Sequence, residues 1–104
     1  MKLLTKELRD KFPKLGETDS KKLEEIPIIA KFFDPTGSWT WYATEGQQEG
    51  DDFIFFGYVR GDFPELGEFS LKELESVKGH FGLGIERDLY FGKHTLAEVM
   101  EERL

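Results

Sequence analysis

The sequence predicts a single α+β domain over residues 1–104, in which an antiparallel β-meander of about four or five strands packs with three short helices. Three observations favour this fold class. A chain of 104 residues has the usual size of one domain, and it contains no internal repeat or linker. Aromatic and β-branched runs are separated by short polar turns, which is typical of neighbouring antiparallel strands. Helix-capping residues followed by apolar stripes lie outside these runs.

The first helix is predicted to begin after Thr5, whose hydroxyl suits an N-cap. Pro13 ends it, because proline lacks an N–H donor and restricts the residue before it. Apolar residues recur every four positions along this stretch, at Leu4, Leu8 and Phe12. Residues 15–25 are polar, so we expect a surface loop there, with a helical turn near Leu23.

Two strands and a tight turn are predicted next. Residues 26–33 are β-branched and aromatic, and Asp34-Pro35-Thr36-Gly37 has the composition of a turn in which proline fixes φ and glycine is free to adopt positive φ. Residues 38–45 alternate in character, so Trp39 and Trp41 should share one face of the second strand. The two tryptophans therefore mark the core face of the sheet.

The second half of the chain predicts the central strand, two helices and a last strand. Residues 53–59 are apolar on both faces, as expected of a central strand covered on both sides. Ser70-Leu71-Lys72-Glu73 is a capping box that opens a helix, and Thr95-Leu96-Ala97-Glu98 repeats it at the start of a C-terminal helix. Between the two helices, residues 82–91 predict a last strand that is entered through a glycine-rich bend.

The charge and the residue composition indicate which kinds of binding partner are favoured. Lys and Arg number 14 against 21 Asp and Glu, which gives a net charge of −7. Direct nucleic-acid binding is therefore disfavoured, whereas a basic protein partner is compatible with the charge. The chain has no cysteine, which excludes a disulfide framework and thiolate chemistry. No apolar stretch approaches the roughly 20 residues of a membrane span, so we expect a soluble, cytoplasmic protein of unknown oligomeric state.

Several strings in the sequence carry a family resemblance. The most specific is Trp39-Thr40-Trp41-Tyr42 followed by Thr44-Glu45-Gly46, and Pro64-Glu65-Leu66-Gly67 and Glu86-Arg87-Asp88 extend it along the chain. Through these strings the chain resembles a bacterial domain-of-unknown-function family of small proteins often encoded on phages, plasmids and integrative elements. The resemblance implies a mobile-element setting, in which defence, counter-defence and transfer functions are common. It implies no particular activity, because the family has no assigned activity.

One charged constellation is a candidate binding site. Strict alternation within residues 82–91 points Arg87 toward the core, where a guanidinium needs a carboxylate partner. Glu45 is the first candidate partner, since alternation places it on the face of Trp41, and Glu65 is the second. A guanidinium fork suits carboxylate or phosphate groups, so Trp41, Glu45, Glu65 and Arg87 define a candidate ligand pocket. The alternative is a purely structural salt bridge.

We predict no catalytic residue, no metal site and no cofactor. No zinc signature, serine-centred triad or phosphate-binding loop occurs, and Ser70 is better explained as a helix cap than as a nucleophile. The two histidines, His80 and His94, have no evident second ligand or base beside them.

The leading functional hypothesis is a non-enzymatic interaction or accessory protein that acts through an unknown protein partner. The alternative is a small-ligand or anion-binding domain with its pocket near Trp41, Glu45 and Arg87. A third class, an enzyme that uses Glu45 or Glu65 as a base, would need a cleft and a strongly perturbed carboxylate pKa.

Overall fold

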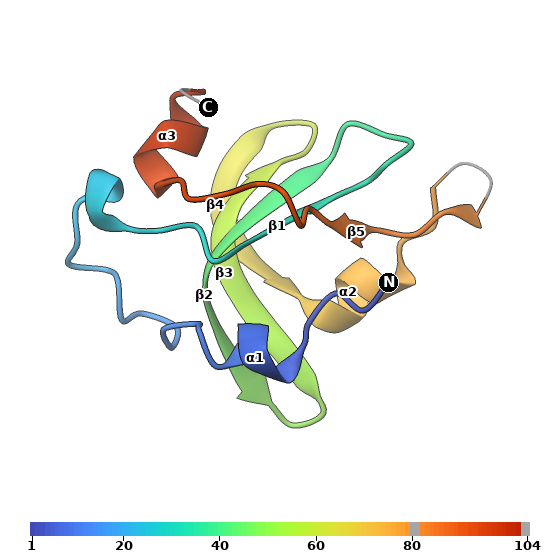
Figure 1. The fold of residues 1–104 in the computed structure, drawn as a ribbon, viewed down its shortest axis with the longest axis horizontal. Helices are drawn as coiled ribbons and strands as arrows, with labels where there is room; N and C mark the ends of the chain where they lie inside the picture. Colours follow the sequence, from blue (N-terminus) through green and yellow to red (C-terminus); the bar gives the residue numbers. More distant parts are fainter. Residues whose placement is uncertain (80–81, 103–104) are drawn as a thin grey trace.

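The computed structural model describes residues 1–79 and 82–102 and shows a five-stranded antiparallel sheet with three short α-helices (Figure 1). The predicted α+β class is therefore confirmed. The order of the strands across the sheet is β4-β3-β2-β1-β5. In chain order the elements are α1 (Lys6–Arg9), the 3₁₀ helix η1 (Leu23–Glu25), β1 (Ala30–Phe33), β2 (Thr40–Glu49), β3 (Asp52–Arg60), β4 (Pro64–Ser70), α2 (Leu71–Ser76), β5 (Glu86–Arg87) and α3 (Leu96–Met100).

The sheet differs from the predicted one in three ways. The central strand is β2 and not β3, because β5 pairs with β1 on one side while only β4, formed by residues 64–70, lies beyond β3 on the other. The strand predicted over residues 26–33 is shorter, since Ile28 donates its N–H to the His94 carbonyl and the ladder with β2 begins only at Ala30. The strand predicted over residues 82–91 is reduced to β5, which pairs with the last two residues of the short β1.

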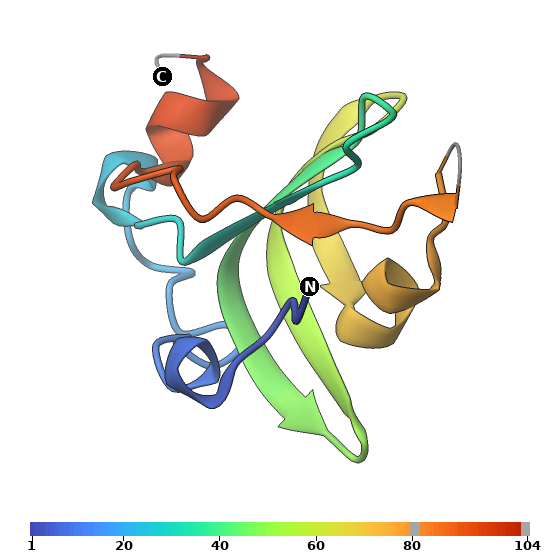
Figure 2. The same cartoon turned by 45° about the vertical axis from the view of Figure 1, so that its right-hand side comes forward.

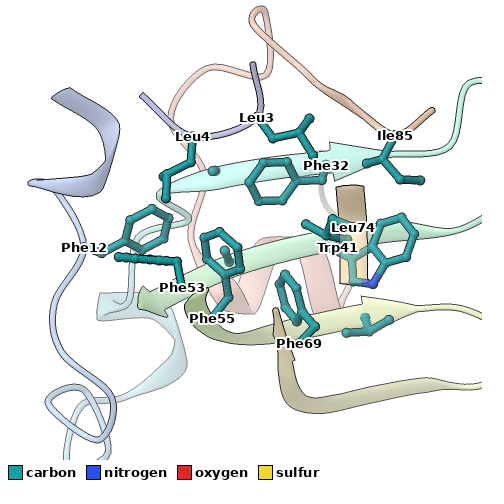
Figure 3. Packing of buried hydrophobic residues seen from close by; sticks show 13 residues of the cluster. Leu3, Leu4, Phe12, Phe32, Trp41, Phe53, Phe55, Phe69, Leu74 and Ile85 are labelled. Carbon is teal, nitrogen blue, oxygen red and sulfur yellow. The ribbon is translucent and has the colours of Figure 1, made fainter. Parts of the chain in front are cut away.

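One face of the sheet carries the larger core, shown in Figure 3. Five phenylalanine rings form its centre, with Phe55 packed edge-on against Phe53 and stacked on Phe69 at 5.2 Å between ring centroids. Large aromatic rings of this kind contribute most of the buried apolar area in a small domain. The N-terminal segment and α2 cover this face, and its buried members are Leu3, Leu4, Phe12, Ala30, Phe32, Trp41, Ala43, Phe53, Phe55, Val59, Phe69, Leu74 and Ile85.

The opposite face carries a smaller core. Tyr42 and Tyr58 stack on neighbouring strands at 6.3 Å between ring centroids. The helix α3 and the segment around Ile26 close over them, and α3 and η1 lie together at one corner of the molecule (Figures 1 and 2). The buried members of this core are Ile26, Ile28, Tyr42, Tyr58, Leu96 and Val99. The sheet therefore lies between two apolar layers.

All three α-helices begin where the sequence predicts. The side chains of Thr5, Ser70 and Thr95 accept hydrogen bonds from backbone N–H groups three residues later, which satisfies donors that a helix start leaves open. Thr95 and Glu98 form the full reciprocal capping box. At Ser70 only half of the predicted box is present within the described part of the chain, because no bond returns from the Glu73 carboxylate.

The described helices include none with the length and apolar character that a transmembrane segment requires.

Candidate functional site

The predicted pocket residues do not converge. The strand registers place Arg87, Phe32, Trp41, Val59 and Glu65 in one row across all five strands, on the face of the larger core. Alternation therefore assigned Arg87 and Trp41 to the correct face. Arg87 and Glu65, however, lie on opposite edges of the sheet, four strand spacings or roughly 19 Å apart. The predicted pairing of Arg87 with Glu65 is wrong for this reason.

Glu45 lies on the opposite face from Trp41, because a β-bulge interrupts the alternation. Ala43 pairs with Gly57 and Glu45 pairs with Phe56, which leaves Thr44 as the extra residue of the bulge. An insertion of one residue moves every later side chain to the other face of the sheet. The predicted ion pair between Glu45 and Arg87 is therefore also wrong.

The Glu45 carboxylate is instead sealed beneath the N-terminal loop. One oxygen accepts the Gly16 N–H at 2.9 Å, and the other accepts the Thr18 N–H at 2.9 Å together with the Thr18 hydroxyl. The side chain is only 2% exposed. Burial raises its pKa, but the bond from the Thr18 hydroxyl and the two backbone bonds outweigh that effect, so the pKa of Glu45 lies below its ordinary value of 4.5. The carboxylate anchors the loop and stays ionised.

Arg87 lies in a cleft of about 320 Å³ between α1, β1 and the segment after β5. Its Nη1 donates to the Leu3 carbonyl at 3.2 Å, and it forms no ion pair within residues 1–79 and 82–102. Lys31 lines the same cleft but is bonded to Asp88 at 3.2 Å. Its other charged residues are Lys11 and Glu7, so the cleft carries charges of both signs.

A different cavity contains both tryptophans. We call it the tryptophan pocket; it has a volume of about 420 Å³, within the usual range for ligand sites, and lies between the β1–β2 hairpin and α2. Trp41 is its buried wall beside Leu74 (Figure 3), whereas Trp39 is 39% exposed. The two indoles lie 5.8 Å apart between centroids and are inclined by 35°. The lining residues are Asp34, Trp39, Trp41, Glu73, Leu74 and Val77.

The hairpin between β1 and β2 positions Asp34 and Trp39. The Asp34 N–H donates to the Trp39 carbonyl at 3.1 Å and closes the hairpin, and one carboxylate oxygen of Asp34 accepts the Thr36 N–H at 2.9 Å. The indole of Trp39 packs directly against Gly61, since a Cβ on Gly61 would lie 2.5 Å from Cζ3 of the ring. Trp39 is therefore held in place although it is exposed.

The helix α2 contributes the second carboxylate. Glu73 is exposed, and its side chain is not used in the expected capping box. Within the described part of the chain, neither Asp34 nor Glu73 forms an ion pair. Lys78 borders a neighbouring cleft that shares Asp34, but it makes no ion pair with it. The tryptophan pocket thus combines an aromatic wall with two carboxylates whose charges are not neutralised by a bonded cation.

Of the four residues that the sequence assigned to a ligand site, only Trp41 lines the tryptophan pocket. Asp34 was interpreted only as a turn residue and Glu73 only as part of a cap, and both assignments are local. Trp39 was placed correctly on the face of Trp41, and this shared face was the one signal in the sequence for an aromatic wall. The hairpin turn and α2 face each other only in the folded protein, and the pattern of the sequence does not indicate this.

The titratable groups of the described residues were compared for a possible metal site. Among residues 1–79 and 82–102, no group of three or more His, Asp or Glu side chains is placed to hold a metal ion. His94 contacts Glu98 at 3.2 Å, an i to i+4 partner that the sequence reasoning overlooked, and this hydrogen bond together with the Thr95 N–H lowers the pKa of Glu98. His80 lies outside the described residues. His94 and Glu98 act locally at the start of α3.

Comparison with protein families gave one finding. A family model described as "Protein of unknown function (DUF2958)" matches residues 3–102. Comparisons with curated proteins and with solved structures gave no match.

Proposed function

Since the chain belongs to the DUF2958 family of proteins of unknown function, we propose its function from its structure: a non-enzymatic interaction protein that captures a basic segment of a protein partner in the tryptophan pocket. One observation carries the proposal. Two tryptophans and two carboxylates without a bonded cation line the same pocket of about 420 Å³. Tryptophan is the residue most enriched at the energetic centres of protein interfaces, and exposed indoles attract cations through their ring faces.

The charge of the whole domain supports a basic partner. With a net charge of −7, the domain attracts basic protein segments and repels phosphate backbones at long range. The pocket would then bind the partner at one defined site, because its walls are apolar and its two carboxylates come from different elements. Long-range attraction would set the association rate, and the pocket would set the dissociation rate.

The carboxylates proposed as bases in the enzyme hypothesis are poorly suited to catalysis. Glu45 is sealed from solvent and its pKa is lowered, whereas a general base at neutral pH needs a pKa raised toward 7 and access to a substrate. Glu65 is exposed on the edge strand β4 and lines none of the cavities described above. These features support a binding role rather than a catalytic one.

The proposed function also includes the biological setting in which the partner is met. We propose that the partner is encountered when the protein acts for a mobile genetic element, a setting supported by the resemblance of the Trp-Thr-Trp-Tyr string and its neighbours.

Partner capture from a lysate of the cells that naturally express the protein tests the proposal. Replacing both pocket carboxylates, by Asp34→Asn with Glu73→Gln, should weaken retention of the partner by about tenfold or more, because hydrogen bonds to charged groups contribute about 1.5–3 kcal/mol each. Quantitative mass spectrometry of proteins bound to the immobilised wild type and variant measures the difference. The retained protein should carry a segment rich in Arg or Lys.

A matched control removes the same two charges elsewhere. Asp19→Asn with Glu75→Gln changes the net charge equally and places one substitution on the same helix, α2, yet neither residue lines the tryptophan pocket. This control should retain the partner as the wild type does. Equal loss with both double variants would mean that only diffuse charge is recognised, and the absence of any partner that depends on the pocket would contradict the proposal.

A further inference from the structure

We infer that the group captured by the tryptophan pocket is an arginine side chain, selected over lysine. This inference rests on the proposed function and deepens it, since it names the chemical group that the pocket recognises. Three features of the pocket carry it: a supported indole face, two separate carboxylates and an apolar floor. Each of them distinguishes a guanidinium from an ammonium group.

The supported indole favours a flat cation. Trp39 is 39% exposed, and it is confined by the backbone of Gly61 and by the ring of Trp41 at 5.8 Å. The two indoles are too close together for a group to insert between them, so a ligand must lie against the pocket side of the rings. A guanidinium is planar and weakly hydrated and stacks on such a surface, whereas an ammonium group keeps its water more strongly.

The two carboxylates favour a cation with several donors spread in a plane. Asp34 projects from the hairpin turn and Glu73 from α2, so they approach the pocket from different elements. One oxygen of Asp34 is already committed to Thr36. A ligand must therefore reach the remaining acceptors from separate directions, which the five fixed N–H donors of a guanidinium allow. The three donors of an ammonium group radiate from a single point.

The floor of the pocket suits the stem of a long side chain. Leu74 is fully buried, Val77 and Trp41 adjoin it, and all three are apolar. Arginine buries its methylene stem against such a surface while its charged end stays with the carboxylates. A neutral planar group could use the floor and the indole but would leave the carboxylates without a cation. The pocket therefore requires both the shape and the charge of arginine.

The test uses three synthetic peptides of glycine and serine that differ only in three evenly spaced residues: arginine, lysine, or citrulline, the neutral analogue of arginine. Tryptophan fluorescence and calorimetry measure their affinities for the wild-type protein. We expect the arginine peptide to bind about three- to tenfold more tightly than the lysine peptide, because the planar guanidinium stacks on the indole face more readily than the strongly hydrated ammonium group, and at least tenfold more tightly than the citrulline peptide. Trp39→Ala should remove the preference for arginine.

A control variant separates an effect at the pocket from a general effect of losing an exposed aromatic residue. Tyr90→Ala removes an aromatic residue that is 94% exposed and lies outside the pocket, and its affinities should match those of the wild type. Equal binding of arginine and lysine peptides, both weakened by Trp39→Ala and by Glu73→Gln, would overturn the arginine preference and leave the proposed function standing. Binding that neither substitution affects would overturn both. Failure of all three peptides to bind at millimolar concentrations would also overturn the arginine inference, and partner capture would then decide the proposed function separately.

Discussion

Replacing Gly57 by alanine is expected to lower the free energy of unfolding by about 3 kcal/mol or more. A Cβ at this position would overlap the Tyr42 carbonyl oxygen and would lie 2.8 Å from its carbon and 2.9 Å from the Cα of Ala43. These are backbone atoms of the adjacent strand beside the β-bulge, so they cannot move aside as a side chain would. Denaturant unfolding followed by circular dichroism measures the loss.

The sheet itself supplies the control. Gly67 pairs directly with Gly57 across β3 and β4, and a Cβ there meets no atom within 4 Å. Gly67→Ala should leave stability unchanged or raise it slightly, because alanine has less conformational freedom to lose on folding. Equal losses for the two alanines would mean that the close approach of β2 to β3 at the bulge is not a constraint on the fold.

Glu45→Gln is expected to lower the free energy of unfolding by about 2–4 kcal/mol. The carboxylate accepts from Gly16 with one oxygen and from Thr18 with the other, so an amide places an NH₂ group against at least one of these donors. A buried donor left without an acceptor carries its full desolvation penalty. Glu17→Gln, in the same loop but exposed, should change stability by less than about 0.5 kcal/mol.

The pH dependence of stability gives an independent control for Glu45. Its pKa is lowered in the folded protein, so its contribution is complete above about 4.5 and is lost as the pH falls below that value through the folded pKa. The wild type should therefore lose stability more steeply in acid than Glu45→Gln does. Parallel pH profiles for the two proteins would contradict the assigned role of this carboxylate.

The local features of the fold were predictable because their partners lie close in sequence. Thr5, Ser70 and Thr95 each cap a helix by accepting from an N–H three residues ahead, and the capping pattern is visible in the sequence itself. The alternation of Trp39 and Trp41 likewise follows from the geometry of one strand, so their shared face was predicted correctly.

The predicted pocket failed for two physical reasons. Alternation assigns a residue to a face but gives no distance across the sheet, so Arg87 and Glu65 share a face from opposite edges. The bulge at Thr44 then moved Glu45 to the other face, and its sequence, Ala-Thr-Glu-Gly, alternates as an unbroken strand would. Register and bulges depend on the neighbouring strands, which the pattern of one strand does not describe.

The tryptophan pocket was missed because it is a tertiary feature. It exists only where the β1–β2 turn meets α2, two elements separated by the whole of β2, β3 and β4. In the sequence, Asp34 was explained as a turn residue and Glu73 as part of a helix cap. Neither explanation indicated that the two residues share a site. In the structure the cap needs only the backbone N–H of Glu73, so its carboxylate is left at the pocket.

The most direct test of the binding function is a two-dimensional NMR titration of the isotope-labelled wild-type protein with the arginine peptide. The proposal predicts that the indole N–H signals of Trp39 and Trp41 shift first, together with backbone amides near Asp34 and Glu73. Saturation of all these shifts at one common affinity would establish a single site in the tryptophan pocket. Small shifts spread over acidic residues across the surface, with both indole signals unmoved, would contradict the proposal and reduce the interaction to non-specific attraction.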